Sequence, residues 1–419
     1  MGNDHTERAE APDVPLLAVV ASGDRRYREY IMRSAASRYR LWLLDAHEPS
    51  WQVPYLLGSA LVDTRDAPAL LAAARAIPSR HGPLAGVLCY DEWSIHTAAT
   101  LAEALGLPTG PPSAVAACRD KAATRHQLAS AGIPQPQSHP VATLEQAVAV
   151  ADKVGYPVVV KARALAGSLG VVRVDQPEEL PAAYTAAAGV SFPGVARQDA
   201  DILVEEYLDG SEISVDCAVV DGWTIPIAVA RKTIGLEPYF EETGHVVDAA
   251  DPLLADPALH DHLTAAHAAV GFRRGMTHTE LRLTREGLRI VEINARLGGD
   301  FIPYLGQLAI GVDLGLVAAD VAAGRHPTIR QTTRRAAAIR FLYPPVDCVV
   351  QDVTVHSGRL GPEIHQAMAT AGPDQLMRLP PRGFLSRYGF VIAVADTPEQ
   401  ARAALADADR MVELRYAPA

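Results

Sequence analysis

The chain has 419 residues, of which 49% are hydrophobic and 21% are charged. This composition is typical of a globular protein, and the length predicts about three domains. The net charge of −11 argues against a general nucleic-acid partner or an acidic membrane surface. A local cluster of cations could still bind phosphates within such a chain.

No uncharged apolar run approaches the roughly 18 residues of a membrane span, and the polar N-terminus lacks a signal-peptide pattern. The 4 cysteines are far apart and show no CxxC spacing, which favours unpaired thiols in a reducing compartment. We therefore expect a cytoplasmic protein with no membrane partner.

The first third of the chain predicts an α/β domain. Residues 1–13 are polar and predict a disordered tail. Apolar runs then alternate with helical stretches, which predicts a small parallel sheet covered by helices on both faces. The expected strands are 16–21, 41–45 and 84–90, the expected helices are 27–38 and one that ends before Gly106, and 108–112 is a linker.

The middle of the chain predicts helices followed by an antiparallel sheet. Asp120 can cap a helix that runs to residue 131, and Thr143 with Gln146 forms a capping box. The strands expected after these helices are 158–161, 171–174, 202–206, 213–220 and 225–230. Near the C-terminus, strand 390–394 precedes a helix that a second capping box opens at Thr397.

The most informative segment, THTELRLTREGLRIVEINAR, reads as two strands joined by a turn at Glu286. A hairpin centred there places Glu280 opposite Glu292, with Asn294 on the same face as Glu292. Two carboxylates opposed across strands repel each other by up to roughly 1 kcal/mol, and a divalent cation would reverse the sign. These oxygen ligands suit Mg²⁺, and the alternative is an exposed, charged sheet face.

A second segment, PVVVKARALAGSLGVVRV, has the features of a phosphate-binding loop. Lys161 ends a buried strand and supplies a compact positive charge. Gly167 and Gly170 would let backbone N–H groups approach phosphate oxygens, and Ser168 adds a hydroxyl donor. The alternative is an ordinary glycine-containing turn, and the P-loop pattern is absent.

A third segment, ILVEEYLDGSEISV, runs from an apolar strand through Glu205-Glu206-Tyr207-Leu208 and a turn to Glu212. Such a stretch between two domains can offer backbone edges to an adenine ring. Glu212 could then accept hydrogen bonds from ribose hydroxyls. The alternative is a hairpin with solvated acids.

Together with the helix RDKAATRHQLASAGIP, these segments resemble the ATP-grasp superfamily in their order and separations. The resemblance covers residues 110–310 closely, and no single motif decides it. It implies an α/β and α+β protein: a parallel α/β domain at 14–112, a two-part ATP-grasp domain at 113–340 with a lid subdomain at about 137–205, and a small α+β domain at 341–419.

The resemblance also implies roles for individual residues. Two lysines would bind the ATP phosphates, and the loop with Ser168 would cover them. The hinge, residues 205–208, would hold adenine, and Glu212 would bind the ribose. The residues implied to bind ATP are Lys121, Lys161, Gly167, Ser168, Gly170, Glu205, Glu206, Tyr207, Leu208 and Glu212. The implied ligands of about two Mg²⁺ ions, for which Mn²⁺ could substitute, are Glu280, Glu292 and Asn294. Arg296 would steady the transferred phosphoryl group.

Two further segments are similar to L-amino-acid (dipeptide) ligases, namely EPYFEETGHVV and SRYGFVIAVADTPEQA. By this analogy Glu242 and His245 would contact the substrate amino group or carboxylate, and either could accept the proton of the amine. After Arg296, the turn LGGD could bind an anion with its backbone, or Asp300 could cap a helix that begins at Phe301.

The resemblance implies a ligase that joins a small carboxylate to an amine, such as two amino acids, through an acyl-phosphate, and dimers are common in the family. Two alternatives remain at this point. The tail SRYGFVIAVADTPEQA also resembles ATP-grasp carboxylases that use bicarbonate. The other alternative is a nucleotide-binding module without turnover.

Overall fold

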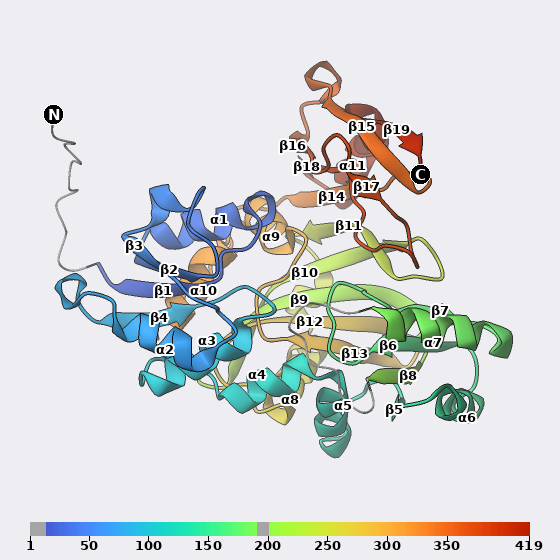
Figure 1. Ribbon diagram of the computed structural model, residues 1–419, viewed down its shortest axis with the longest axis horizontal. Helices are drawn as coiled ribbons and strands as arrows, with labels where there is room; N and C mark the ends of the chain where they lie inside the picture. The colour runs from blue at the N-terminus through green and yellow to red at the C-terminus, as the bar shows by residue number, and fades with distance from the viewer. Residues whose placement is uncertain (1–13, 191–200) are drawn as a thin grey trace.

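We describe a computed structural model of the chain, covering residues 14–190 and 201–419. The tail expected at 1–13 lies outside these residues. The described strands form four sheets: a parallel N-terminal sheet, an antiparallel lid sheet, an eight-stranded central sheet and a small C-terminal sheet. Figure 1 shows the central sheet in the middle, with the N-terminal unit, the lid and the C-terminal unit around it.

The N-terminal unit is a four-stranded parallel sheet in the order β3-β2-β1-β4. Alternate residues of β1 face opposite ways, so Leu17 and Val19 pack towards α1 while Ala18 and Val20 pack towards α2 and α3. The elements are β1 Leu16–Val20, α1 Arg25–Ala36, β2 Arg40–Asp45, β3 Gly58–Leu61, α2 Ala67–Arg75, β4 Leu84–Leu88 and α3 Ile95–Ala104. This confirms the predicted parallel layer.

Two helices lead into the lid. Asp120 caps α5 through the N–H groups of Ala122 and Ala123, as predicted. The lid sheet is antiparallel in the order β5-β8-β6-β7, with α6 and α7 packed on it. The elements are α4 Pro112–Arg119, α5 Lys121–Ser130, β5 Ser138–Val141, α6 Leu144–Val154, β6 Val158–Ala162, β7 Val172–Val174, α7 Leu180–Gly189 and β8 Ile202–Glu206.

The central sheet has the order β13-β12-β9-β10-β11-β14-β18-β16. One face packs on α8 through residues such as Val215 and Val219 of β9. The other face packs on α9 and α10 through residues such as Ala228 and Ala230 of β10, and it carries polar side chains such as Glu212 and Glu280 nearer the hairpin. Its first five strands and their helices are β9 Gly210–Val220, β10 Trp223–Gly235, β11 Glu241–Asp248, α8 Pro257–Ala269, β12 Gly275–Thr284, β13 Gly287–Asn294, α9 Ile302–Ile310 and α10 Leu314–Ala322.

The C-terminal unit is continuous with the central sheet. The expected domain boundary at residues 340–341 falls inside β14, which pairs with β11 on one side and β18 on the other. The remaining elements are β14 Ala336–Leu342, β15 Cys348–Val355, β16 Ile364–Ala369, β17 Leu376–Met377, β18 Gly389–Ala395, α11 Pro398–Ala404, α12 Ala408–Met411 and β19 Val412–Pro418. The capping box at Thr397 forms as predicted.

The hairpin of β12 and β13 has the predicted pairing, which it reaches in a different way. Its turn is centred between Arg285 and Glu286 instead of on Glu286, because Thr284 pairs with Gly287. A bulge then leaves Val291 without a partner and shifts the register. Beyond the bulge Glu280 faces Glu292, so both carboxylates share the polar face of the sheet.

Among the described residues, no single helix is long and apolar enough to cross a membrane. The pair α9 and α10 reaches that length and composition only when taken together, and the two helices are bent by 110°.

Gly86 of β4 lies at a close backbone contact between the N-terminal unit and α10. A Cβ atom at this position would lie 1.9 Å from the carbonyl oxygen of Ala322, at the end of α10. Gly86→Ala must therefore shift backbone, and we expect it to lower the free energy of unfolding by about 1–3 kcal/mol in denaturant titrations. Gly358→Ala, where the described atoms leave open space, is the control and should stay within about 0.5 kcal/mol of wild type.

His267 of α8 predicts a pH dependence of stability. The ring is buried, with Nδ1 2.9 Å from Thr224 Oγ1 and Nε2 3.0 Å from Thr279 Oγ1. Burial lowers the pKa of His267 to about 4. Because the unfolded chain then binds a proton that the folded chain does not, stability falls as the pH drops from 6.5 to 4 and levels off below.

We expect this loss to reach about 3 kcal/mol at most. His267→Gln removes the titrating group, so the variant should not show this loss. In urea titrations, the free energy of unfolding of wild type minus that of the variant should therefore decrease as the pH drops from 6.5 to 4. An unchanged difference would contradict the prediction.

Candidate functional site

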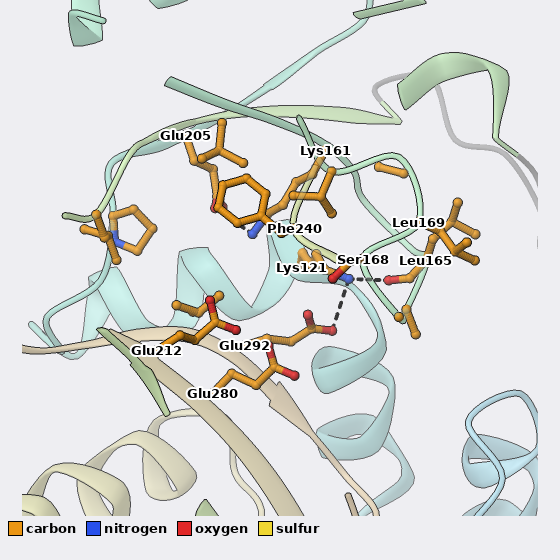
Figure 2. A pocket seen from close by; sticks show the side chains of 18 of the residues that line it. Lys121, Lys161, Leu165, Ser168, Leu169, Glu205, Glu212, Phe240, Glu280 and Glu292 are labelled. Carbon is orange, nitrogen blue, oxygen red and sulfur yellow. Dashed lines mark hydrogen bonds and ion pairs between the residues drawn. The ribbon is translucent and has the colours of Figure 1, made fainter. Parts of the chain in front are cut away.

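A cavity of about 890 Å³, including its open mouth, lies between the lid sheet and the polar face of the central sheet. All predicted site residues except Gly170 and His245 line it. Figure 2 shows the acidic side chains of Glu212, Glu280 and Glu292 on one side, with Lys121 and Lys161 facing them. The three predicted segments therefore meet in one place.

The loop between β6 and β7 lines the cavity on the side of the lid sheet. Gly167 and Gly170 have φ of 68° and 70°, a region that favours glycine, and Ser168 adopts φ of 57° between them. A non-glycine residue in this region costs of order 1 kcal/mol, and such strain gathers at ligand clamps. Gly170 packs against Ala187 of α7 instead of lining the cavity.

Glu205 lies at the start of the hinge, and two cations hold its carboxylate. Arg125 of α5 donates to it at 2.7 and 3.2 Å, and Lys161 Nζ is 2.6 Å away. Burial opposes ionisation, but Arg125 and Lys161 outweigh it and lower the pKa of Glu205 to about 2. Burial likewise lowers the pKa of Lys161, against the attraction of Glu205. The Glu205 carboxylate is therefore already engaged by cations of the protein.

Arg125 also links the hinge to the hairpin. Its guanidinium donates to the carbonyls of Ile290 and Val291 at 3.1 and 2.7 Å. These carbonyls belong to the bulge that sets the pairing of Glu280 with Glu292. One buried side chain thus stabilises two walls of the cavity.

The hairpin carboxylates have an all-oxygen donor set, which fits Mg²⁺ bound together with phosphate oxygens. Lys121 Nζ lies 3.1 Å from Glu292 Oε1 and also contacts the Leu165 carbonyl (Figure 2). Burial opposes ionisation of Glu280, but Lys232 and His278 lower its pKa well below the usual range. Glu280 is therefore anionic at neutral pH, as a metal ligand must be.

Arg296 follows the hairpin and is held by an acid from the N-terminal unit. Its Nε contacts Glu92, whose other oxygen contacts Arg119. Burial opposes ionisation of Glu92, but the two arginines outweigh it and lower its pKa to about 2. Glu92 could not be identified from the sequence, because a single Glu after a predicted strand carries no signal of its distant partner.

The far end of the site holds the two residues predicted to bind substrate. His245 is fully buried, with Nε2 3.1 Å from Glu242 and 3.8 Å from Asp300. Asp300 does not cap α9, since both its oxygens accept from Arg387 at 2.7 Å. Burial lowers the pKa of His245, but Asp300 and Glu242 outweigh it and raise it. Arg387 brings the C-terminal unit to this end.

Two further cations were missed by sequence reasoning. Lys232 of β10 lies among Glu212, Glu242 and Glu280, and Arg282 Nη2 is 2.9 Å from Glu212. Lys232 follows Arg231 in a strand and Arg282 lies between two leucines, and neither belongs to a recognisable motif. Strand alternation could have placed Arg282 on the face of Glu280, two residues away, but no local signal locates Lys232.

Comparison with known families agrees with this geometry. Residues 154–303 match the ATP-grasp domain family, which covers most of the lid and the hairpin. Residues 340–417 match the L-amino acid ligase C-terminal domain 2 family.

Among known proteins, the chain is 27% identical over 376 residues to the uncharacterized protein y4rH of Sinorhizobium fredii, covering 86% of this chain and 74% of that protein. It is 28% identical over 252 residues to alanine–anticapsin ligase of Bacillus subtilis, covering 55% of this chain and 52% of that enzyme. The chain thus aligns with about half the length of that ligase.

The fold is similar to the crystal structure of L-amino acid ligase from Bacillus licheniformis, with a TM-score of 0.79 and 22% identity over 96% of this chain and 99% of that one. The two matching domain families show that this chain carries an ATP-grasp domain followed by a C-terminal domain of the L-amino acid ligases, and its fold agrees with that pairing.

Proposed function

We propose that this chain joins the carboxylate of one amino acid to the amine of another through an acyl-phosphate, with release of ADP and phosphate. One observation carries the proposal. The oxygen ligands Glu280, Glu292 and Asn294 and the guanidinium of Arg296 line the same cavity as Glu242, whose neighbour is His245. With these assignments, the phosphate-transfer site and the amine-binding site would be contiguous.

The nucleotide would lie between the lid and the central sheet. Lys121 and Lys161 would bind its phosphates, and the loop at Ser168 would cover them. The backbone of residues 205–208 would hold adenine, and Glu212 would accept from the ribose. Glu280, Glu292 and Asn294 would hold about two Mg²⁺ ions, which neutralise the charge of the phosphates when bound.

These residues would account for the two steps of the reaction, which are formation of the acyl-phosphate and its attack by the amine. Attack of a substrate carboxylate on the terminal phosphate needs positioning and charge neutralisation, which Arg296 and the two lysines supply. The lid excludes water, because an acyl-phosphate in open solvent would hydrolyse. The amine then attacks the acyl carbon, and phosphate leaves.

Glu242 and His245 would handle the incoming amine. Burial opposes ionisation of Glu242, but Lys232 and His245 outweigh burial and lower its pKa. Glu242 is therefore anionic at neutral pH and can bind a substrate ammonium group. His245 beside it is the second candidate for accepting the proton that the amine must lose.

A screen of ADP release over pairs of amino acids tests the reaction class. We expect ADP only when a productive pair is present, and a product whose mass equals the two amino acids less one water. Omitting bicarbonate should leave the rate unchanged. ADP release that requires bicarbonate would point to a carboxylase, and the absence of ADP with every pair would point to a module without turnover.

Glu292→Gln tests the metal site. The substitution keeps the shape but removes a charged oxygen ligand, so we expect ADP release to fall by roughly 10²-fold or more. Glu286→Gln, on the exposed turn of the same hairpin, is the matched control and should keep the wild-type rate. Thermal unfolding of both variants checks that the fold is intact. Near-wild-type turnover by Glu292→Gln would refute the assignment.

A further inference from the structure

Lys232 is the most enclosed cation of the site. Its side chain has 0% exposure, although β10 places it beside a cavity that is open to solvent. Its Nζ lies 2.6 Å from Glu242 Oε1, 3.0 Å from Glu280 Oε1 and 3.2 Å from Glu212 Oε1. The three acids come from three other strands, namely β11, β12 and β9.

These three carboxylates have the spacing of a cation site. One oxygen from each lies within 4.8 Å of the others, as in a set of ligands around a single ion. Three anions this close in a partly buried place repel one another strongly unless a cation lies between them. Lys232 Nζ lies within 3.2 Å of an oxygen of each acid. Its ammonium group is therefore the cation at the centre.

Each carboxylate belongs to a different part of the proposed site. Glu212 is on the ribose side, Glu280 pairs with Glu292 across the hairpin, and Glu242 contacts His245 at the amine side. A single ammonium group thus contacts the nucleotide, metal and substrate regions. Its three donors are directional, so it fixes the position of each acid more closely than diffuse screening would.

We propose that Lys232 is a built-in counter-ion that occupies the place of a divalent cation among Glu212, Glu242 and Glu280, and so confines Mg²⁺ to the side of Glu280 that faces Glu292. It is a positioning residue, and this role in the reaction rests on the proposed function. The occupancy itself does not, because it depends only on the geometry of the lysine and its three acids.

The proposal is tested by counting bound Mn²⁺ in Lys232→Met without nucleotide, using the electron paramagnetic resonance signal of free Mn²⁺. We expect the variant to bind one more Mn²⁺ per chain than wild type, because the three acids lose their resident cation. Its thermal midpoint should also rise more steeply with Mn²⁺. A folded variant with the wild-type number of Mn²⁺ ions would overturn the proposal.

Arg231→Met is the matched control. Arg231 is the preceding residue of β10 and also carries one positive charge, but it points to the opposite face and pairs with Asp251 at 2.7 Å. Its loss should add no Mn²⁺ site. An extra ion in both variants would reflect net charge alone and would count against the proposal.

Two further measurements cover a variant that folds poorly. If Lys232→Met is unfolded without metal, recovery of the folded state on adding Mn²⁺ supports the proposal, and failure to fold at saturating Mn²⁺ overturns it. In Lys232→Met/Glu242→Gln the extra ion should disappear, and its persistence would place the ion elsewhere. None of these readouts requires turnover, so they remain decisive whether or not a productive pair of amino acids is found.

Discussion

The site depends on one electrostatic constraint, the close approach of several carboxylates on one partly buried face of a sheet. Glu212, Glu280 and Glu292 lie on adjacent strands, where like charges repel. Lys121, Lys232 and Arg282 each form an ion pair with one of these acids. A protein that places fixed cations beside these acids can concentrate negative charge without binding metal indiscriminately.

Much of this arrangement could be predicted from the sequence, because it arises from local periodicity. Strand alternation and a short turn placed Glu280 opposite Glu292, and the capping residues Asp120 and Thr397 marked the beginnings of their helices. The hairpin prediction was correct partly by compensation, since the misplaced turn and the unrecognised bulge at Val291 shift the register in opposite directions. A pairing prediction can thus be right where its turn is wrong.

The rest could not be predicted, because it depends on partners far apart in the chain. Arg125 reaches the bulge 165 residues later, and Glu92 holds Arg296 across 204 residues. Glu205 illustrates the consequence. The sequence places it in the hinge, but only the fold shows that its carboxylate is already bound by two cations. Local patterns located the acids, and tertiary packing supplied their counter-ions.

The continuity of β14 with the central sheet bears on how the specificity of such enzymes could be recombined. The C-terminal domain family begins to match at residue 340, in the middle of this strand. In a chimera joined at that boundary, β14 would consist of residues from two proteins. This mixed strand would have to pair in register with both β11 and β18. Exchange of the C-terminal unit between relatives should therefore succeed only when the crossover lies before Ala336, so that the donor supplies the whole strand.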